Sequence, residues 1–309
     1  MRRNFWLLGA FLLASTLAVA GCCTSDGGGG NGGGGGEDVD FKLGDLIEPF
    51  DPPTLEELEA AVAASGGWVD QPVLDSMQLM RERQAGEPQL ATVEEALKLR
   101  NNSDEENDKI VSALGRLPAS DDVVNFDAVI TRTTPQALNH MNPLLSSTVT
   151  EQEVSGFSSF GLFSFDWNFT PFAATDSVVS WQTSKDGMYD KVVMRDDLLW
   201  SDGEPITAHD IEFSFQLIMT KGVPIPAMRS GTEEMKCVKA YDDHTVVFFH
   251  KKPLVTNVWN INYGILPKHV YEDSVQEDPT LTSSDHHIAL EDDPVVGGGY
   301  QVVKRDNTE

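Results

Sequence analysis

The sequence predicts a mixed α/β fold, because three stretches in its second half carry strand and helix patterns. Two β-prone runs, 178–181 and 189–194, flank a Lys-Asp-Gly turn signal at 185–187 and predict a hairpin. Residues 199–220 have the pattern of a strand, a turn and a helix, and residues 237–249 that of a strand, a turn and a strand. Together these elements predict a sheet that carries a helix.

Composition limits the functions that are open to the chain. It has 309 residues, with 22 Lys and Arg against 49 Asp and Glu, and a formal net charge of −27. Such a charge argues against nucleic acid or an anionic membrane surface as the partner, since both repel carboxylates. Its three Cys, two of them adjacent, cannot form a disulfide framework. We therefore expect an acidic globular protein whose function has to come from motifs.

Residues 1–21 have the layout of a bacterial export signal. Arg2 and Arg3 precede an uncharged apolar run of 16 residues at 5–20, which is shorter than the roughly 20 residues of a membrane-spanning helix. The run closes in Val-Ala-Gly before Cys22, an ending that resembles the lipobox of bacterial lipoproteins. That resemblance implies cleavage before Cys22 and its acylation, and two or three acyl chains anchor a protein stably. The alternative is a secreted protein with an ordinary signal peptide.

A tether and a helical segment are expected behind the signal. Residues 22–50 contain a ten-residue stretch with nine Gly, a composition that predicts a flexible linker holding a folded body off the membrane. Residues 51–118 predict a loosely packed, acidic helical extension, because capping boxes begin at Thr54, Thr92 and Ser103 and apolar residues follow at helical spacing. Docking of a partner is the alternative role for this extension.

The strongest local pattern spans residues 199–211. Asp202-Gly203 marks a turn, and Thr207 is placed to cap the following helix. Asp210, at the third helical position, completes a capping box in which Asp replaces the usual Glu, so the reciprocal bond is less certain. These structural roles account for the pattern without any chemistry.

The same block resembles a signature of the family 5 extracytoplasmic solute-binding proteins, which serve oligopeptide, dipeptide and nickel ABC importers. The resemblance continues in the family's order through further stretches at 137–143, 160–163, 179–181, 237–249 and 265–271. It implies a type II periplasmic-binding-protein-like fold. Because family members usually continue well beyond the position of Glu309, we expect residues 119–309 to form an incomplete version, the first lobe plus an inserted subdomain.

The resemblance also implies roles for individual residues. Ten motif residues are expected to be structural: Trp200, Ser201, Asp202, Gly203, Thr207, Asp210, Pro267, Lys268, His269 and Tyr300. The loop at 294–300 departs from the family pattern, with Val for its first Gly and Gly for its second Pro, which leaves its geometry open. Candidates for solute contact lie near turns expected at the cleft edge, namely Asn139, Asn142, Phe160 and Trp167; an ordinary loop or core role is the alternative for each.

Catalysis is not expected. The chain has no Gly-x-Ser-x-Gly elbow and no phosphate-binding loop. His286-His287 lies among acidic residues, but its spacing is not that of a helical metal-ligand pair, and we expect a solvated acidic loop there. We therefore expect neither a metal nor a cofactor.

The resemblance implies a lipid-anchored receptor on the extracytoplasmic or periplasmic face of the cell envelope. Its partners would be a peptide or similar small solute, ABC permease subunits, and the bilayer through acylated Cys22; nucleic acid is not among them. Two alternatives stay open. One is a truncated remnant that no longer binds solute, and the other is a lipid-anchored module that reuses the half-fold to bind a protein.

Overall fold

The computed structural model describes residues 41–85, 127, 129, 131, 137–166 and 168–305. The predicted signal peptide with Cys22, the capping boxes at Thr92 and Ser103, and the candidate Trp167 lie outside these residues. Within the described part, no helix has the length and apolar character needed to cross a membrane.

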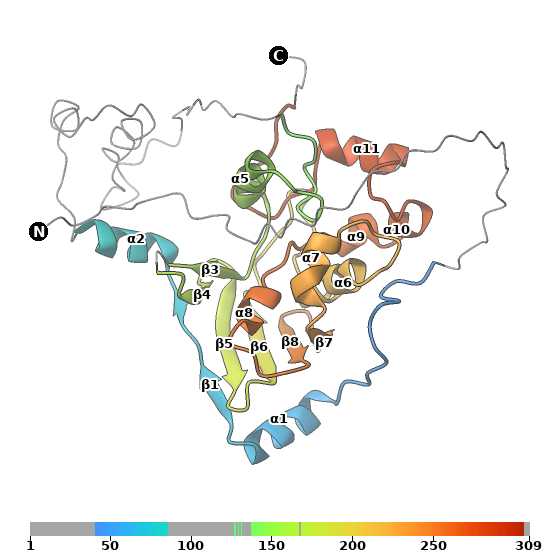
Figure 1. The fold of residues 1–309 in the computed structure, drawn as a ribbon. Coiled ribbons are helices and arrows are strands. Elements are labelled where there is room, and N and C mark those ends of the chain that lie inside the picture. The colour runs from blue at the N-terminus through green and yellow to red at the C-terminus, as the bar shows by residue number, and fades with distance from the viewer. Residues whose placement is uncertain are drawn as a thin grey trace, which may run out of the picture. The chain divides into compact units, whose positions relative to one another are not determined.

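An antiparallel sheet of five strands, in the order β1-β5-β6-β8-β7, forms the centre of the fold (Figure 1). Its two predicted hairpins are confirmed: β5 pairs with β6, and β7 pairs with β8. Gly187 in the first turn has φ +71°, a left-handed conformation that glycine adopts readily. The strands are β1 Trp68–Asp70, β5 Val178–Ser184, β6 Tyr189–Met194, β7 Met235–Ala240 and β8 Thr245–His250.

A second, smaller sheet makes the fold a mixed one, as predicted. Its order is β2-β4-β3, with β2 parallel and β3 antiparallel to β4. These strands are β2 Val73–Leu74, β3 Phe163–Phe165 and β4 Pro171–Ala174. The helices are α1 Leu55–Ala64, α2 Ser76–Ala85, α5 Val149–Ser158, α6 Ala208–Ile218, α7 Pro226–Thr232, α8 Asn257–Asn260, α9 Lys268–Tyr271, α10 Ser274–Glu277 and α11 Asp285–Asp292.

Both faces of the central sheet are covered at strand β8. Val246 and Phe248 belong to the large core that contains α6, whereas Val247 and Phe249 pack against Leu58 and Val62 of α1. Successive residues of a strand point to opposite faces, so α6 and α1 lie on opposite sides of β8. The exposed fraction of each of these four strand side chains is 0% or 1%, which explains the unbroken apolar run.

Helix α6 confirms the prediction for the strand-turn-helix block. Ile211, Phe215 and Ile218 are all buried on its core-facing side. Thr207 occupies the N-cap position, and its backbone N–H donates to Asp210 Oδ2 at 2.7 Å. The shorter Asp side chain therefore does reach back to the cap, as the Glu of the usual capping box would.

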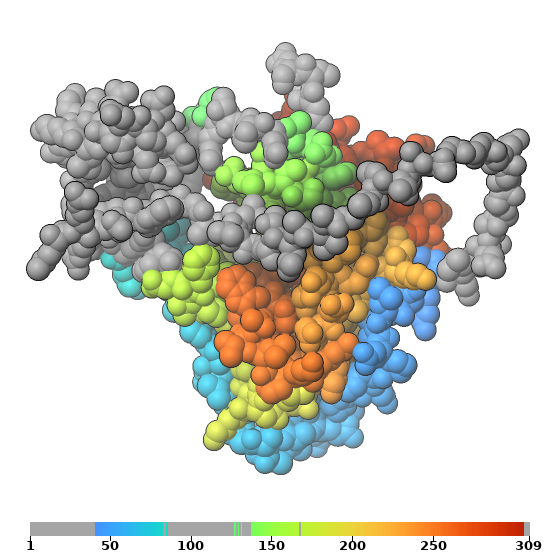
Figure 2. All heavy atoms as spheres, viewed as in Figure 1, coloured from blue at the N-terminus to red at the C-terminus, as the bar shows by residue number. Residues whose placement is uncertain are grey.

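The structure corrects the prediction of a loosely packed helical extension at 51–118. The first capping box is confirmed, because Thr54 N donates to Glu57 Oε2 at 2.9 Å at the start of α1. However, strands β1 and β2 join the two sheets, so the described part of this segment, residues 51–85, is built into the fold. In Figure 2 the α1 segment lies against the β5–β6 hairpin, where Lys191 Nζ donates to Glu59 Oε1 at 2.6 Å.

The last ten residues of the predicted tether also pack against the fold. Gly44 N donates to Thr220 Oγ1 at 2.8 Å, and Leu46 N donates to Met219 O at 3.0 Å. Phe41 contacts the large core. The prediction of a free linker over 22–50 is therefore wrong for residues 41–50, and residues 22–40 lie outside the described part.

Candidate functional site

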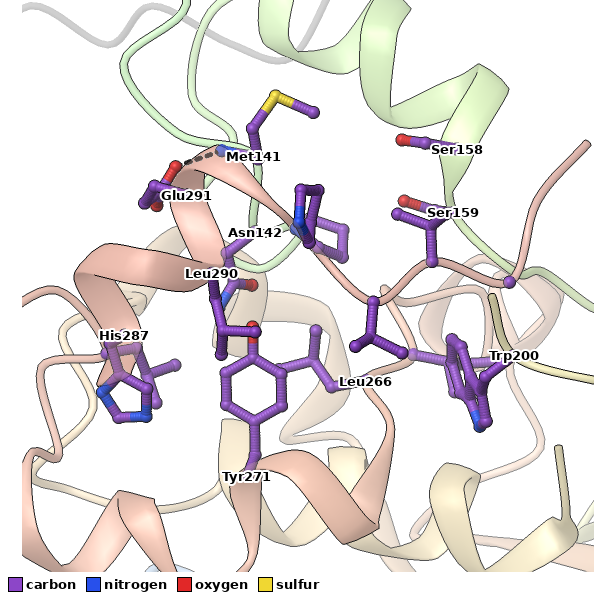
Figure 3. Close-up of a pocket in the computed structure, with 17 residues that line it drawn as sticks. Met141, Asn142, Ser158, Ser159, Trp200, Leu266, Tyr271, His287, Leu290 and Glu291 are labelled. Atoms are coloured by element: carbon purple, nitrogen blue, oxygen red, sulfur yellow. Dashed lines mark hydrogen bonds between the residues drawn. The ribbon is translucent and has the colours of Figure 1, made fainter. Parts of the chain in front are cut away.

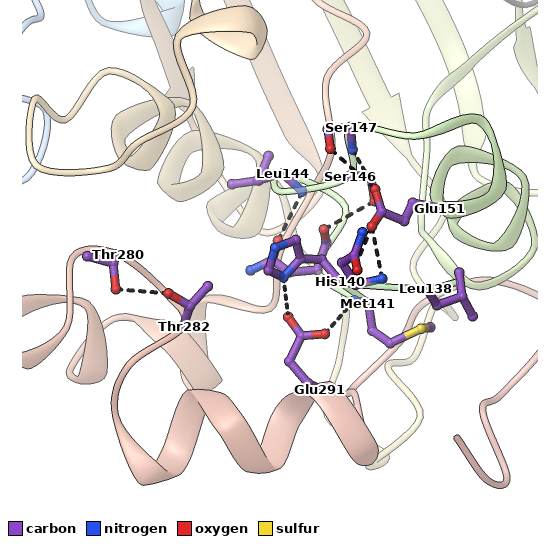
Figure 4. A network of polar contacts seen from close by, with 12 residues as sticks. Leu138, His140, Met141, Leu144, Ser146, Ser147, Glu151, Thr280, Thr282 and Glu291 are labelled. Atoms are coloured by element: carbon purple, nitrogen blue, oxygen red, sulfur yellow. Dashed lines mark hydrogen bonds and ion pairs between the residues drawn. The ribbon is translucent and has the colours of Figure 1, made fainter. Parts of the chain in front are cut away.

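The candidate site is the loop at 137–148, which a buried carboxylate fastens to α5 (Figure 4). Glu151 is 1% exposed, and its Oε2 accepts from the N–H groups of Ser147 and Thr148, each at 2.8 Å. Its Oε1 accepts from Asn139 N at 3.0 Å and His140 N at 3.3 Å. One side chain thus closes the helix cap and holds the far end of the loop.

The environment of Glu151 favours its ionised form strongly. Burial by itself raises the pKa of Glu151. The hydrogen bonds from Ser147, Thr148 and Asn139 lower it by more than burial raises it, and the net result is a pKa of about 2. Glu151 is therefore a carboxylate at neutral pH and accepts four backbone N–H groups of its own loop.

A second carboxylate holds the same loop from α11. Glu291 Oε2 accepts from Met141 N at 2.6 Å, and its Oε1 lies 3.2 Å from His140 Nδ1. Arg305 donates to Glu291 Oε2 at 3.0 Å and to the carbonyl oxygens of Leu138 and Asn139 at 2.6 and 2.8 Å. The loop is therefore fixed by the adjacent helix α5 and by Glu291 and Arg305 from the distant end of the described chain.

The predicted solute contacts occupy different environments. Asn139 lies exposed on the loop, while Asn142 is 7% exposed and its Oδ1 accepts from Leu144 N at 2.9 Å. Phe160 is also 7% exposed and meets Trp200 edge-on, with ring centroids 6.3 Å apart, in the large core. The structure thus brings the two Asn together on one loop and places Phe160 in the core. A role in solute contact stays a prediction for these residues.

A small cavity lies between this loop, α9 and α11 (Figure 3). Asn142, Tyr271, His287 and Leu290 line it, and Asn142 Nδ2 has no hydrogen-bond partner among the described residues. Burial, and to a smaller extent the charge of Glu291, raises the pKa of Tyr271 far above its usual range, so its hydroxyl stays protonated. The cavity volume of about 20 Å³ is room for about one water molecule and excludes a peptide.

The family-motif residues, although distant in sequence, meet beside the site. Asp202 Oδ2 lies 2.7 Å from His269 Nε2, and Asp210 Oδ1 accepts from Lys268 N at 2.7 Å. Pro267 is the N-cap residue of the helix that carries both partners. Burial raises the pKa of Asp202, but the contact with His269 lowers it, and the net effect is a decrease. The motif at 199–211 therefore positions the motif at 265–271 through the carboxylates of Asp202 and Asp210.

The loop at 294–300 is hydrogen-bonded to the motif at 199–211. Ser201 N donates to Val296 O at 2.8 Å, and Val296 N donates to Ser201 Oγ at 3.0 Å. A Cβ on Gly298 would lie 2.6 Å from the Phe157 carbonyl oxygen, so only glycine allows this approach. The Tyr300 ring contacts Phe157 edge-on, at 5.6 Å between centroids. The loop therefore packs closely against its neighbours although it has Val for the first Gly and Gly for the second Pro of the family pattern.

The two adjacent His residues are not in a solvated loop, which corrects the prediction for them. They lie in helix α11, and His287 is 1% exposed. Its Nδ1 is 2.8 Å from Asp278 Oδ2, and its Nε2 is 2.9 Å from Ser274 Oγ. Within the part of the chain that the structure describes, no group of three or more His, Cys, Asp or Glu side chains is placed to hold a metal ion.

Sequence reasoning missed the two carboxylates that hold the loop. Thr148 and Glu151 form a Thr-x-x-Glu capping box that is visible in the sequence and begins α5. Glu291 and Arg305 carry no comparable local signal, since the loop residues that they bind lie 150 and 167 positions away.

Comparison with known proteins finds a family model that matches part of the second half of the chain. Residues 174–309 match the family model of the bacterial extracellular solute-binding proteins, family 5 Middle. This match confirms the resemblance predicted from the motifs, over the residues that it covers. No curated protein matches the chain in sequence.

Several solved structures are similar to part of the chain. NikZ from Campylobacter jejuni, in complex with Ni(L-His), is 27% identical, with 56% of this chain and 32% of that chain covered and a TM-score of 0.47. The substrate-binding protein CtaP from Listeria monocytogenes is 24% identical, with 54% and 32% covered and a TM-score of 0.45. The oligopeptide-binding protein AppA from Bacillus subtilis, in complex with a nonapeptide, is 21% identical, with 46% and 28% covered and a TM-score of 0.40. The matched part thus spans about a third of each of these chains.

Proposed function

We propose that this chain is a solute-binding component of a peptide-type ABC transporter and captures oligopeptide-like solutes for import. The family match over residues 174–309 carries the proposal. Its partners are a peptide or similar small solute and the ABC permease subunits. The chain acts by binding, because family 5 consists of solute-binding receptors.

The proposed location is the extracytoplasmic or periplasmic face of the cell envelope, with Cys22 as the lipid attachment point. The export-signal layout of residues 1–21 supports this location. Lipid attachment also makes physical sense for a chain of net charge −27, which has no electrostatic attraction to anionic lipids.

The geometry supports a solute contact at the loop 137–148. Loop residues usually carry binding functions when a rigid scaffold positions them. Here Glu151 and Glu291 fix the backbone of Asn139 and its neighbours, while the Asn139 side chain stays exposed. An amide presented from a fixed backbone can donate to and accept from the main chain of a bound peptide.

Isothermal titration calorimetry tests the proposal on the chain from Cys22 onward, prepared without acylation. A mixture of peptides of two to nine residues should give saturable heat. Replacing Asn139 by Ala should weaken binding severalfold, whereas Gln276→Ala, an exposed amide on α10, should leave it unchanged. Absence of saturable heat with every peptide would contradict the proposal and favour the non-binding remnant or the protein-interaction module.

A further inference from the structure

Three aromatic side chains form a partly exposed cluster between β3 and α8. Phe165 and Trp259 stack with ring centroids 3.9 Å apart and planes inclined by 11°, and Phe169 lies 6.5 Å from Trp259. Trp259 is 46% and Phe169 is 51% exposed. We call Phe165, Phe169 and Trp259 the aromatic platform. Figure 2 shows the β3–β4 hairpin beside the α8 segment on one face of the molecule.

The hairpin loop holds Phe169 in a strained conformation. Its φ of +61° lies in the left-handed region, which is a true outlier for a bulky residue. Asp166 Oδ1 accepts from Asn168 N and Thr170 N, each at 2.8 Å, and Phe169 N donates to Asp166 O at 3.0 Å. Such strain persists only where the surroundings enforce it, and it is concentrated at functional sites. In this conformation the Phe169 ring is exposed and lies beside Trp259.

A carboxylate accompanies the exposed rings. Asp166 directly follows Phe165 in the chain, and its Oδ1 accepts from the N–H groups of Asn168 and Thr170. Burial raises its pKa, but the hydrogen bonds from Thr170 and Asn168 together outweigh burial and lower the pKa overall, so the group is ionised at neutral pH. The whole chain adds a field of net charge −27.

This combination selects one class of ligand. Aromatic faces attract cations, Trp most strongly, and a planar guanidinium stacks on them while it donates to a carboxylate. An anionic ligand would be repelled, and a neutral aromatic ligand would gain nothing from Asp166. An arginine side chain uses both the rings and the carboxylate.

We propose that the aromatic platform and Asp166 bind the guanidinium group of an arginine residue in a peptide ligand. The inference rests on the proposed function and narrows it, because it assigns the chain to arginine-containing peptides. It also gives Trp259 the role of a specificity-determining residue.

The test compares two peptides on the unaltered protein. Calorimetry at low ionic strength is run with Gly-Arg-Gly and with Gly-citrulline-Gly, whose side chain has nearly the same shape but no charge. We expect the arginine peptide to bind about tenfold more tightly, and added salt to reduce that difference. This comparison needs no variant and therefore does not depend on how a substitution affects folding.

Variants then locate the site. Trp259→Leu removes the stacking face, and Asp166→Asn keeps an amide oxygen for the loop N–H groups while it removes the charge. Each should weaken binding of the arginine peptide by roughly threefold or more, and neither should change the affinity of the citrulline peptide by as much. Matched controls outside the platform, Phe157→Leu and Asp176→Asn, should leave both affinities within about twofold.

The outcomes separate this inference from the proposed function. Equal affinity for the two peptides, or an unchanged arginine preference in Trp259→Leu, would overturn the inference and leave peptide binding intact. If neither tripeptide binds while the mixed peptides do, the inference alone fails. If no peptide binds at all, both fail.

Discussion

Replacing Glu151 by Gln should destabilise the folded chain in a way that depends on pH. A pKa lowered from 4.5 to about 2 corresponds to about 3 kcal/mol of stability at neutral pH, at about 1.36 kcal/mol for each tenfold change in acidity. Because Glu151 is 1% exposed, solvent screens its charge little. Gln retains one acceptor oxygen and turns an NH₂ group towards backbone donors, so most of this stability should be lost.

The sign of the pH dependence follows from the direction of the shift. Because the folded pKa is the lower one, the contribution is complete above about pH 4.5 and is lost as the pH falls towards 2. Urea unfolding at pH 7 should therefore show the variant about 3 kcal/mol less stable, and the difference should shrink steadily below pH 4.5. Glu277→Gln, an exposed carboxylate on α10, should change stability by less than about 0.5 kcal/mol.

One result would refute this reasoning directly. If the Glu151→Gln variant is less stable by the same amount at pH 7 and at pH 2.5, the loss comes from packing or helix capping and not from the charge. A difference below about 0.5 kcal/mol at pH 7 would mean that the four N–H groups find other acceptors at little cost.

Three further predictions concern other parts of the chain. Leu58→Ala should lower the free energy of unfolding by about 2–5 kcal/mol, measured by urea titration, because the side chain is 0% exposed beneath the sheet; a loss under 1 kcal/mol would mean that α1 is dispensable. Gly298→Ala should cost about 1–3 kcal/mol, because its Cβ would meet the backbone of Phe157 and Ser158; thermal unfolding checks this, and an unchanged melting temperature contradicts it. Cys22→Ala should abolish acyl labelling and release the protein from membranes; retained labelling would disprove the lipobox interpretation.

The elements that local sequence specifies were predicted well. The hairpin β5–β6 and helix α6 are set by turn residues, a cap and periodic apolar residues within about 20 positions of one another, and the structure confirms both. The meeting of Asp202 with His269 was not predicted, because contacts between separate motifs depend on tertiary packing.

The role of residues 51–85 shows where local reasoning stopped short. The helical pattern of α1 was recognised, but the three-residue strand β1 is too short to give a periodic signal. A clue did exist elsewhere, since the apolar run at 246–249 requires burial on both faces of β8. That requirement predicts a covering element, although it does not say which segment supplies it.

The candidate site was only partly predictable for a similar reason. Asn139 and Asn142 were predicted to lie near turns, but the carboxylates of α5 and α11 that fix their loop were not. The stack of Phe165 on Trp259 joins residues that are 94 positions apart, and neither residue has a local signature. Long-range pairings of this kind depend on the complete fold.

The large negative charge now divides into two populations of carboxylates with opposite effects. Exposed acids repel one another, so the folded protein gains stability when they become protonated. Buried acids such as Glu151 and Asp278 instead hold neighbouring turns and helix starts in place by accepting several hydrogen bonds from residues within 12 positions of them, and their lowered pKa values mean that protonation weakens those contacts. Burial raises the pKa of Asp278, but bonds from Thr280, His287 and two backbone N–H groups outweigh it. Because the pKa of each of these two carboxylates is lowered from its usual value, their contacts persist into moderate acid, and those of Glu151 keep the loop 137–148 fastened to α5 there.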